Sequence, residues 1–579
     1  MDKTMSRHHG SSAERVLKGV PASPGVAIGR AFVLSVDSPT IRNDRLRSED
    51  VDAELARFAG AVEVSTAELH RAVEIARTEK GTVASIIESF VHIVNDPSIT
   101  TAIIDRIKHG YPAESAVVAE YDTHKAVLYG ARDAFMRERA QDLEHVKERL
   151  LAAMRNRHMS HAAAADSIVV AGSVTPQDML FFKQNSTLGF ITEVGGINAH
   201  TSILARDIGI PAVIGVRNAT SDIPRNATII VDGYSGLIII DPTPATITEY
   251  AEKRLRAEAY RQRLGELREK DSTTTDGVHV ALLANIDTPD DVDVAMMQGC
   301  EGVGLVRTEL LLVQLGRYPS LEEQTAWYKD IAERAFPLPV TFRAFDVGSD
   351  KFREGIPHHE DNPALGLRGI RFLLYRPDIF AQQVFAVLRA SVNRNVRFML
   401  PMVSVYEELQ QAKQIIAACR QALMAEGVEF DHNMPVGVMI ETPAAALLAD
   451  VFARETDFMS IGTNDLAQYA LATDRTNELV ADIFDACHPS VLRMIRMIVV
   501  AAEAHGRSVS VCGELAGHAA ATEMLVGLGI RELSVTPRLL LEVKQRVRTT
   551  SNAEACQLVE QLLQCTSTLG VHALLTGSR

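Results

Sequence analysis

The chain has 579 residues, 46% of them hydrophobic, which is enough for three or four globular domains with ordinary cores. A formal charge of -15 argues against a nucleic-acid or membrane-surface partner and permits a basic protein partner. No apolar run approaches the roughly 18 residues of a membrane span, and residues 1–14 lack the apolar core of a signal peptide. The cysteines have no paired spacing and all lie in the second half, which argues against a disulfide framework or zinc site and fits a reducing cytoplasm: Cys300, Cys419, Cys487, Cys512, Cys556 and Cys565.

The first part of the chain is predicted to combine a strand with a long helical segment. Residues 1–16 are expected to be a disordered leader, and its His8-His9 pair is too short for a metal site. Residues 20–34 begin with turn residues and end in a short apolar run, which predicts a strand. From about residue 48 to 156 the pattern has helical periodicity with few prolines or glycines, so an all-helical insertion is predicted over residues 41–156.

Short apolar strands then return, separated by turns and one helix. Together with residues 17–40 they predict an α/β domain that includes residues 157–246. A charged, helix-favouring stretch over residues 247–270 has no breaker until Gly265 and predicts a connector helix. The strands of this domain are expected at residues 167–171, 188–192, 212–214, 228–231 and 237–240.

The second half of the chain, residues 271–579, alternates apolar strands with helices. Eight such strands in alternation predict a (β/α)₈ TIM barrel, so that the whole chain is a multidomain α/β protein. The strands are expected at residues 278–284, 302–306, 340–345, 396–400, 437–440, 458–461, 508–511 and 532–535.

Polar residues follow the predicted barrel strands directly. Because the C-terminal strand ends of such a barrel form its active-site rim, these side chains are expected to converge. The alternative for any single one is an ordinary ion pair at the rim. The set consists of Arg307, Asp346 with Lys351, Glu441, Asn464 with Asp465, and Cys512 with Glu514.

The rim residues suggest anion binding, metal binding and proton transfer. Arginine forks at 307, 343 and 475 are suited to hold a dianionic phosphate and a carboxylate. Glu441 and Asp465 are hard oxygen ligands on neighbouring strands, which suits one Mg²⁺ that shares its shell with the substrate. Cys512 is a proton-transfer candidate, although a lone buried cysteine is usually a packing residue.

The segment GGINAHTSILAR, residues 195–206, places His200 between a glycine turn and two hydroxyl residues that open an apolar run. This pattern predicts a strand-to-helix junction, where Thr201 and Ser202 cap the helix and free amides stabilise phosphate oxygens. A phosphoryl group transferred to His200 would find its anion site already formed. The alternative is a loop histidine beside an N-capped helix.

Two further segments, VMIETPAAA at residues 438–446 and SIGTNDLAQY at 460–469, follow the histidine segment in this order. With it they resemble phosphoenolpyruvate-dependent phosphotransferases of the Enzyme I kind, from about Leu17 to about Arg548. The resemblance implies a phosphohistidine swivelling α/β domain followed by a phosphoenolpyruvate-binding barrel. It also implies that the cysteine of Cys512-Gly-Glu protonates the enolpyruvate carbon.

Carried over residue by residue, the resemblance assigns a role to each site residue. His200 would accept the phosphoryl group, and Glu441 and Asp465 would hold Mg²⁺. The next acceptor would be a histidine of the carrier protein HPr, docked on the helical insertion, and the barrels would pair into a homodimer. The residues expected to bind phosphoenolpyruvate are Arg307, Arg343, Arg475, Arg368, Asn464 and Asp465.

Departures from the family pattern are few. Ser349 stands where a second glycine is usual, Phe90 stands where the insertion often has histidine, and Ile197-Asn198 replace Arg-Thr before the active histidine. None of them removes a reacting group. The differences at Phe90 and Ile197 leave open which carrier paralogue is preferred.

Three alternatives remain at this stage. A pyruvate phosphate dikinase or phosphoenolpyruvate synthase would need a large ATP-binding domain upstream, and no glycine-rich nucleotide loop is present. A non-catalytic regulator that binds phosphoenolpyruvate should have lost a reacting residue, yet all are intact. Sugar-uptake and nitrogen-regulatory forms resemble each other in every catalytic segment, and the lack of an N-terminal sensor domain favours the sugar form.

Overall fold

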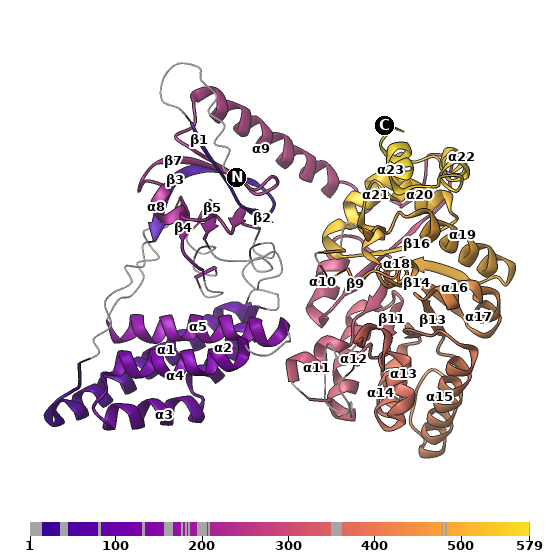
Figure 1. Ribbon diagram of the computed structural model, residues 1–579. Coiled ribbons are helices and arrows are strands. Elements are labelled where there is room, and N and C mark those ends of the chain that lie inside the picture. The colour runs from indigo at the N-terminus through magenta and orange to yellow at the C-terminus, as the bar shows by residue number, and fades with distance from the viewer. Residues whose placement is uncertain are drawn as a thin grey trace. The chain divides into compact units, whose positions relative to one another are not determined.

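The computed structural model describes residues 14–34, 44–78, 83–129, 134–155, 166–174, 178–179, 182, 186–193, 205, 209–315, 317–348, 360, 362–475, 477, 479–480 and 483–577. The described chain divides into two compact units, Met1–Tyr260 and Arg261–Arg579 (Figure 1). Several residues singled out from the sequence lie outside the described ranges: His8, His9, Ile197, Asn198, His200, Thr201, Ser202, Ser349 and Lys351.

The first unit contains a mixed sheet of eight strands in the order β1-β8-β7-β3-β4-β5-β6-β2. The neighbours from β3 to β6 are parallel, whereas β1, β2, β7 and β8 pair antiparallel. Apolar side chains cover both faces, because alternate residues of the central strands fall into different core clusters. The strands are β1 Arg15–Lys18, β2 Val20–Ser23, β3 Val26–Leu34, β4 Ser167–Ala171, β5 Gly189–Thr192, β6 Ala212–Ile214, β7 Thr228–Asp232 and β8 Leu237–Ile240.

The N-terminal strands differ from the prediction in two respects. The single strand expected over residues 20–34 is interrupted after Ser23, where Pro24 cannot donate a backbone hydrogen bond and Gly25 has a φ of +144°. In addition, β1 begins at Arg15, inside the segment predicted as a leader, because its backbone pairs with β8. The remaining strands of this sheet lie within one residue of the predicted ranges.

Among the residues that the structure describes between the adjacent parallel strands β3 and β4, five α-helices and no strand occur, which confirms the helical insertion in the α/β fold (Figure 1). In this bundle α1 packs against α2 and α5, and α4 packs against α3 and α5. Phe90 is 3% exposed in its core, with its ring edge toward His145. The helices are α1 Val51–Thr78, α2 Val83–Val94, α3 Pro97–Lys108, α4 Ala113–Tyr129 and α5 Ala134–Met154; a short helix, α8 Ala219–Asp222, follows β6.

The connector helix α9 spans Pro244–Gly265. It begins three residues before the predicted start and ends five residues before the predicted end. It begins there because Thr243 caps it, accepting a hydrogen bond from the amide of Thr246 at 3.2 Å. Near its start, Lys253 pairs with the buried Asp232 of β7 at 2.5 Å and lies over the rings of Tyr234 and Tyr250. This half of α9 is therefore fixed to the sheet of the first unit.

The second unit is a closed barrel of eight parallel strands, β9 to β16 in chain order, which confirms the predicted (β/α)₈ architecture. Its strands are short and buried on both faces, as expected where helices cover the outside. The strands are β9 Ala281–Ile286, β10 Val303–Val306, β11 Val340–Arg343, β12 Val396–Leu400, β13 Val436–Ile440, β14 Phe458–Ile461, β15 Ser508–Val511 and β16 Glu532–Val535.

Helices surround these strands (Figure 1). Among the described residues, no helix of the chain is both long enough and apolar enough to cross a membrane. The helices are α10 Pro289–Met297, α11 Glu309–Leu315, α12 Leu321–Ala335, α13 Ile370–Tyr375, α14 Pro377–Ala390, α15 Tyr406–Glu426, α16 Pro443–Leu447, α17 Ala449–Glu455, α18 Thr463–Leu471, α19 Pro489–Ala504, α20 Thr522–Gly527, α21 Leu540–Thr549, α22 Asn552–Leu562 and α23 Thr568–Gly577.

The first barrel strand starts three residues later than predicted. Val278 and Val280 belong instead to an antiparallel hairpin that precedes the barrel. They form backbone hydrogen bonds with Thr274 and Ser272, respectively. The isolated bridge between Thr273 and His279 belongs to the same hairpin, which turns at Gly277 with φ +88°. An apolar run alone does not distinguish this hairpin arm from the start of β9.

Candidate active site

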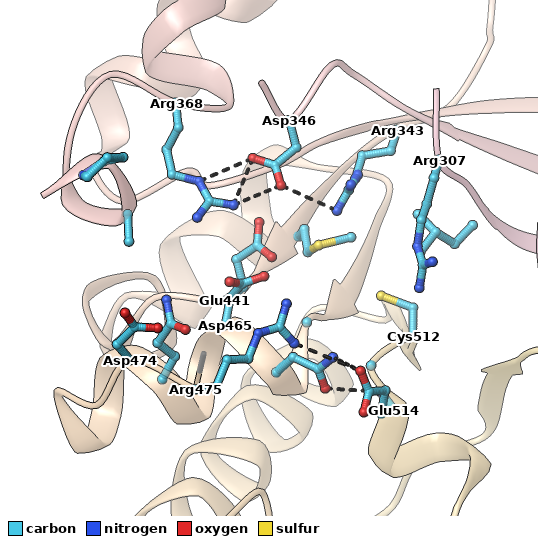
Figure 2. A pocket seen from close by; sticks show the side chains of 18 residues that line it. Arg307, Arg343, Asp346, Arg368, Glu441, Asp465, Asp474, Arg475, Cys512 and Glu514 are labelled. Atoms are coloured by element: carbon cyan, nitrogen blue, oxygen red, sulfur yellow. Dashed lines mark hydrogen bonds and ion pairs between the residues drawn. The ribbon is translucent and has the colours of Figure 1, made fainter. Parts of the chain in front are cut away.

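A cavity of about 500 Å³ opens at the C-terminal ends of the barrel strands. Its lining comes from five strands, β10, β11, β13, β14 and β15, and from the loops and helix starts that follow them. Figure 2 shows these side chains around the cavity. The lining residues are Leu305, Arg307, Arg343, Asp346, Pro363, Ala364, Arg368, Met439, Glu441, Gly462, Asn464, Asp465, Gln468, Asp474, Arg475, Cys512, Gly513 and Glu514.

Two buried arginines are held on one side of the cavity by a shared carboxylate. Asp346, 2% exposed, pairs with Nη2 of Arg368 at 2.9 Å and with Nη1 of Arg343 at 3.8 Å (Figure 2). Burial lowers the pKa of each guanidinium, but the neighbouring carboxylates outweigh it, so both pKa values lie above the ordinary value. Arg343 and Arg368 are therefore permanent cations in fixed positions.

Glu309 and Tyr469 complete this buried cluster. Glu309 pairs with Nη2 of Arg343 at 3.0 Å and accepts a hydrogen bond from the backbone N–H of Asp346 at 2.6 Å. The hydroxyl of Tyr469 accepts a hydrogen bond from Nη1 of Arg368 at 3.3 Å and donates to the carbonyl of Ala364, a wall residue of the cavity. The two side chains connect α11 and α18 to the arginines.

Arg307 and Arg475 are held more loosely at the mouth. Arg307, 45% exposed, has Nη1 3.6 Å from the carboxylate of Asp287, which is 46% exposed. Nη1 of Arg475 lies 3.9 Å from Glu514. Ion pairs of this length and exposure contribute little to stability, so both forks remain available to an incoming anion.

Glu441 and Asp465 form an acidic pair in the lining of the cavity. Glu441 is 1% exposed and accepts a hydrogen bond from the backbone N–H of Met402 at 2.6 Å. Burial and the charges of Asp465 and Asp346 raise the pKa of Glu441 above its ordinary value. No group of three or more His, Cys, Asp or Glu side chains that could hold a metal ion occurs among the residues described.

Cys512 lies at the floor, 4% exposed, among Leu305, Met399 and Met439. Its sulfur accepts a hydrogen bond from the hydroxyl of Ser460 at 3.2 Å, and Ser460 accepts one from Ser510 at 2.8 Å. Burial raises the pKa of Cys512 to about 11, although the Ser460 hydrogen bond acts in the other direction. The side chain is thus a thiol at neutral pH and holds a proton beside the cavity.

Asn464 joins α18 to the segment after β15. Its amide donates to Oε1 of Glu514 at 3.0 Å, and the backbone N–H of Glu514 donates to its carbonyl oxygen at 3.1 Å. Gly513 allows this close approach, and Gly462 allows a second one, between the segments that follow β14 and β13. A Cβ at Gly513 would lie 1.9 Å from Oγ1 of Thr463, and one at Gly462 would lie 2.7 Å from Oε2 of Glu441.

The structure brings together every predicted rim residue that it describes, whereas Lys351 lies outside the described ranges. His200, predicted on the α/β domain of the first unit, also lies outside them. Sequence reasoning missed Gln468, although it follows Asn464 by four residues on α18 and so shares its face. It also missed Asp474, which directly precedes Arg475. Glu309 and Tyr469 act through long-range contacts that no local spacing signals.

Comparison with known proteins places this cavity in a family. Residues 18–139 match the N-terminal domain of the PEP-utilising enzymes, residues 163–236 match their mobile domain, and residues 261–552 match their PEP-binding domain. The cavity and all its lining residues fall in the last of these segments.

Curated relatives match over nearly the whole chain. The phosphoenolpyruvate-protein phosphotransferases of Bacillus sp. (strain S) and Geobacillus stearothermophilus are each 36% identical over 563 residues, 95% of this chain and 96% of theirs. A solution structure of Enzyme I (nEIt) is 34% identical, with a TM-score of 0.37, and covers 42% of this chain and 99% of its own. The chain therefore belongs to the phosphoenolpyruvate-protein phosphotransferases, a family of PEP-utilising enzymes.

Proposed function

We propose that this chain transfers the phosphoryl group of phosphoenolpyruvate to its own His200 and then to a histidine of the carrier protein HPr, releasing pyruvate. The observation that carries the proposal is the composition of the barrel cavity. Four arginines, two facing carboxylates and a buried thiol converge on one space of about 500 Å³. A phosphorylated enol acid needs these groups: cations for its phosphate and carboxylate, and an acid for its carbon.

The arginines are proposed to bind the substrate from two positions, at the mouth of the cavity and behind it. Arg307 and Arg475 present half-exposed forks at the mouth, and Arg343 is held rigidly behind them by Glu309 and Asp346. Guanidinium forks bind phosphate and carboxylate oxygens in a bidentate way, and they stabilise the charge that spreads over the phosphoryl group as it leaves. Arg368 and Asn464 complete the pocket.

Glu441 and Asp465 are the proposed Mg²⁺ ligands. The acidic pair fits a cation: burial first, and then the charges of Asp465 and Asp346, raise the pKa of Glu441, and a bound cation would favour its ionised form. Mg²⁺ prefers one or two carboxylates together with substrate oxygens. When bound, the ion would neutralise charge on the phosphoryl oxygens.

Cys512 is the proposed proton donor to the enolpyruvate carbon. Transfer of the phosphoryl group leaves the enolate of pyruvate, whose methylene carbon takes the thiol proton to give pyruvate and a thiolate. The hydroxyl of Ser460, 3.2 Å from the sulfur, stabilises that thiolate until it regains a proton from solvent. Because tautomerisation to pyruvate is favourable, it draws the transfer toward the phosphohistidine.

The second transfer is proposed to occur on the first unit, with HPr docked on the helical bundle α1 to α5. We also propose that the protein acts in the cytoplasm, since all six cysteines are free in the structure, and that it works as a homodimer paired through the barrel. Sedimentation of the purified chain with and without phosphoenolpyruvate tests the last point.

The test of the proposed function is phosphorylation by labelled phosphoenolpyruvate. We expect the full chain with Mg²⁺ to gain an acid-labile, base-stable label and to pass it to HPr. His200→Ala should abolish the label without changing the affinity for phosphoenolpyruvate, because it removes only the acceptor. Label that persists in His200→Ala would assign the acceptor elsewhere, and a wild-type chain that takes no label would refute the function.

A further inference from the structure

Arg307, like Arg475, is loosely held at the mouth of the cavity, but its partner Asp287 lies outside the lining. Asp287 directly follows β9, as Arg307 directly follows β10. The parallel register aligns Val306 with Ile286, and the backbone N–H of Arg307 donates to the carbonyl of Ile286 at 3.0 Å. The two charged residues therefore stand next to each other on adjacent strand ends.

The backbone at Asp287 is fixed even though its side chain is exposed. Its N–H and that of Thr288 donate to Oδ2 of Asp291, at 3.0 and 2.8 Å, in the capping box that begins α10. The carboxylate of Asp287 thus stays at the mouth of the cavity beside Arg307. Its contact with Arg307 at 3.6 Å, half exposed to water, is weak enough to be exchanged for a better anion.

We infer that Asp287 competes with the phosphate of phosphoenolpyruvate for Arg307 and so sets the affinity for this substrate. The inference rests on the proposed function. A phosphate dianion that reaches the fork must displace the carboxylate and then bind beside its negative charge. Once the phosphoryl group has left, Asp287 returns to the guanidinium. It is a specificity-determining residue that touches Arg307 and acts through it.

The contrast with the buried arginines supports this inference. Arg343 and Arg368 have partners at 3.0 and 2.9 Å that are almost inaccessible to water. Their counter-ions belong to the folded structure and do not exchange. The partner of Arg307 has a similar charge but is only half buried, so it behaves as a competitor and not as a support.

The experiment compares Asp287→Asn with a matched control, Asp290→Asn, in the full-length enzyme with saturating HPr. Asp290 is also 46% exposed and pairs with an arginine at 2.9 Å, but this arginine, Arg334, does not line the cavity, whereas Arg307 does. For Asp287→Asn we expect the KM for phosphoenolpyruvate to fall about 2- to 5-fold, with kcat changed less than about twofold. The inhibition constant of inorganic phosphate should fall in parallel.

Two further variants secure the interpretation. Asp287→Glu keeps the charge and should return KM toward the wild-type value, whereas Asp287→Ser should behave like Asp287→Asn. The inference is overturned if Asp287→Asn leaves KM unchanged or raises it, or if Asp290→Asn lowers KM equally. A wild-type chain that forms no phosphohistidine would instead refute the proposed function, so the two failures are distinguishable.

Discussion

Asp346 accepts hydrogen bonds from Arg368 on both of its carboxylate oxygens, from Nη2 at 3.1 and 2.9 Å and from Nε at 3.4 Å. The same carboxylate lies 3.8 Å from Nη1 of Arg343. One buried anion thus holds two guanidiniums on the same side of the cavity. It places positive charge there before any substrate arrives, at the cost of removing three charges from water.

Asp346→Asn is expected to destabilise the barrel strongly. The amide leaves two buried guanidiniums short of negative charge, and breaking a buried pair in this way costs about 3 to 5 kcal/mol. Asp378→Asn is the matched control, because Asp378 pairs with Arg376 at 2.7 Å on the surface and its loss should cost about 1 kcal/mol or less. Urea denaturation followed by circular dichroism measures both. Equal losses would mean that Asp346 contributes no more than a surface ion pair.

Cys512→Ala should slow the formation of pyruvate about 10² to 10⁴-fold, since general acid catalysis is typically worth this much. Exchange of the phosphoryl group between the enzyme and phosphorylated HPr moves no proton to carbon and should change little. Cys419→Ala is the control: burial raises the pKa of Cys419 to about 11 as well, but this thiol lies on α15 and does not line the cavity.

The ratio of the two half-reactions decides the role of Cys512. If Cys512→Ala slowed both to the same extent, the thiol would be a packing residue of the barrel floor. If Cys419→Ala reproduced the selective loss, the effect would come from core packing in general.

Glu441→Gln and Asp465→Asn should each raise the Mg²⁺ concentration needed for half-maximal phosphorylation of His200, because a neutral amide is a poorer ligand for a hard cation. Asp474→Asn serves as the control, since Asp474 is an acidic residue that lines the same cavity but is not a proposed ligand. Titration with Mn²⁺, followed by electron paramagnetic resonance, measures binding without turnover. Wild-type metal affinity in both variants would remove these residues from the metal site.

A fragment of residues 1–270 should accept a phosphoryl group from phosphorylated HPr and return it, yet be inert toward phosphoenolpyruvate. The reason is that the cavity lies wholly in the second unit, whereas the first half of α9 is fixed to the sheet through Lys253 and Asp232. We expect α9 to serve as the swivel that carries His200 between the two partners, on the microsecond-to-millisecond scale of domain closures. Direct labelling of the fragment by phosphoenolpyruvate would contradict a barrel substrate site.

The architecture and the rim could be predicted from the sequence because both are local patterns. Each barrel strand is a short apolar run, and a parallel barrel places the residues that follow these runs at one rim. For this reason Arg307 and Glu441, which follow two different strands, could be predicted to lie in the same site. The supporting contacts could not be predicted. The hydrogen bond from Tyr469 to Ala364 joins residues 105 positions apart, and the pairing of Arg368 with Asp346 depends on the path of the intervening loop.

The predicted starts of β9 and α9 were wrong for different reasons. Val278 and Val280 continue the apolar run of β9 but belong to a hairpin that the register of the barrel excludes. At α9 the signal was present, since Thr243-Pro244 is a typical cap and first-turn pair, but the prediction began three residues later.

The burial of Cys512 also affects how readily its thiol is oxidised. Peroxides attack thiolates, and a thiol that is 4% exposed with a pKa of about 11 is almost never a thiolate at neutral pH. The sulfur that carries the proton is thereby shielded from sulfenic acid formation, while the exposed Cys556 is open to oxidation without harm to the cavity. We therefore expect peroxide to oxidise the exposed Cys556 before Cys512 in the resting protein.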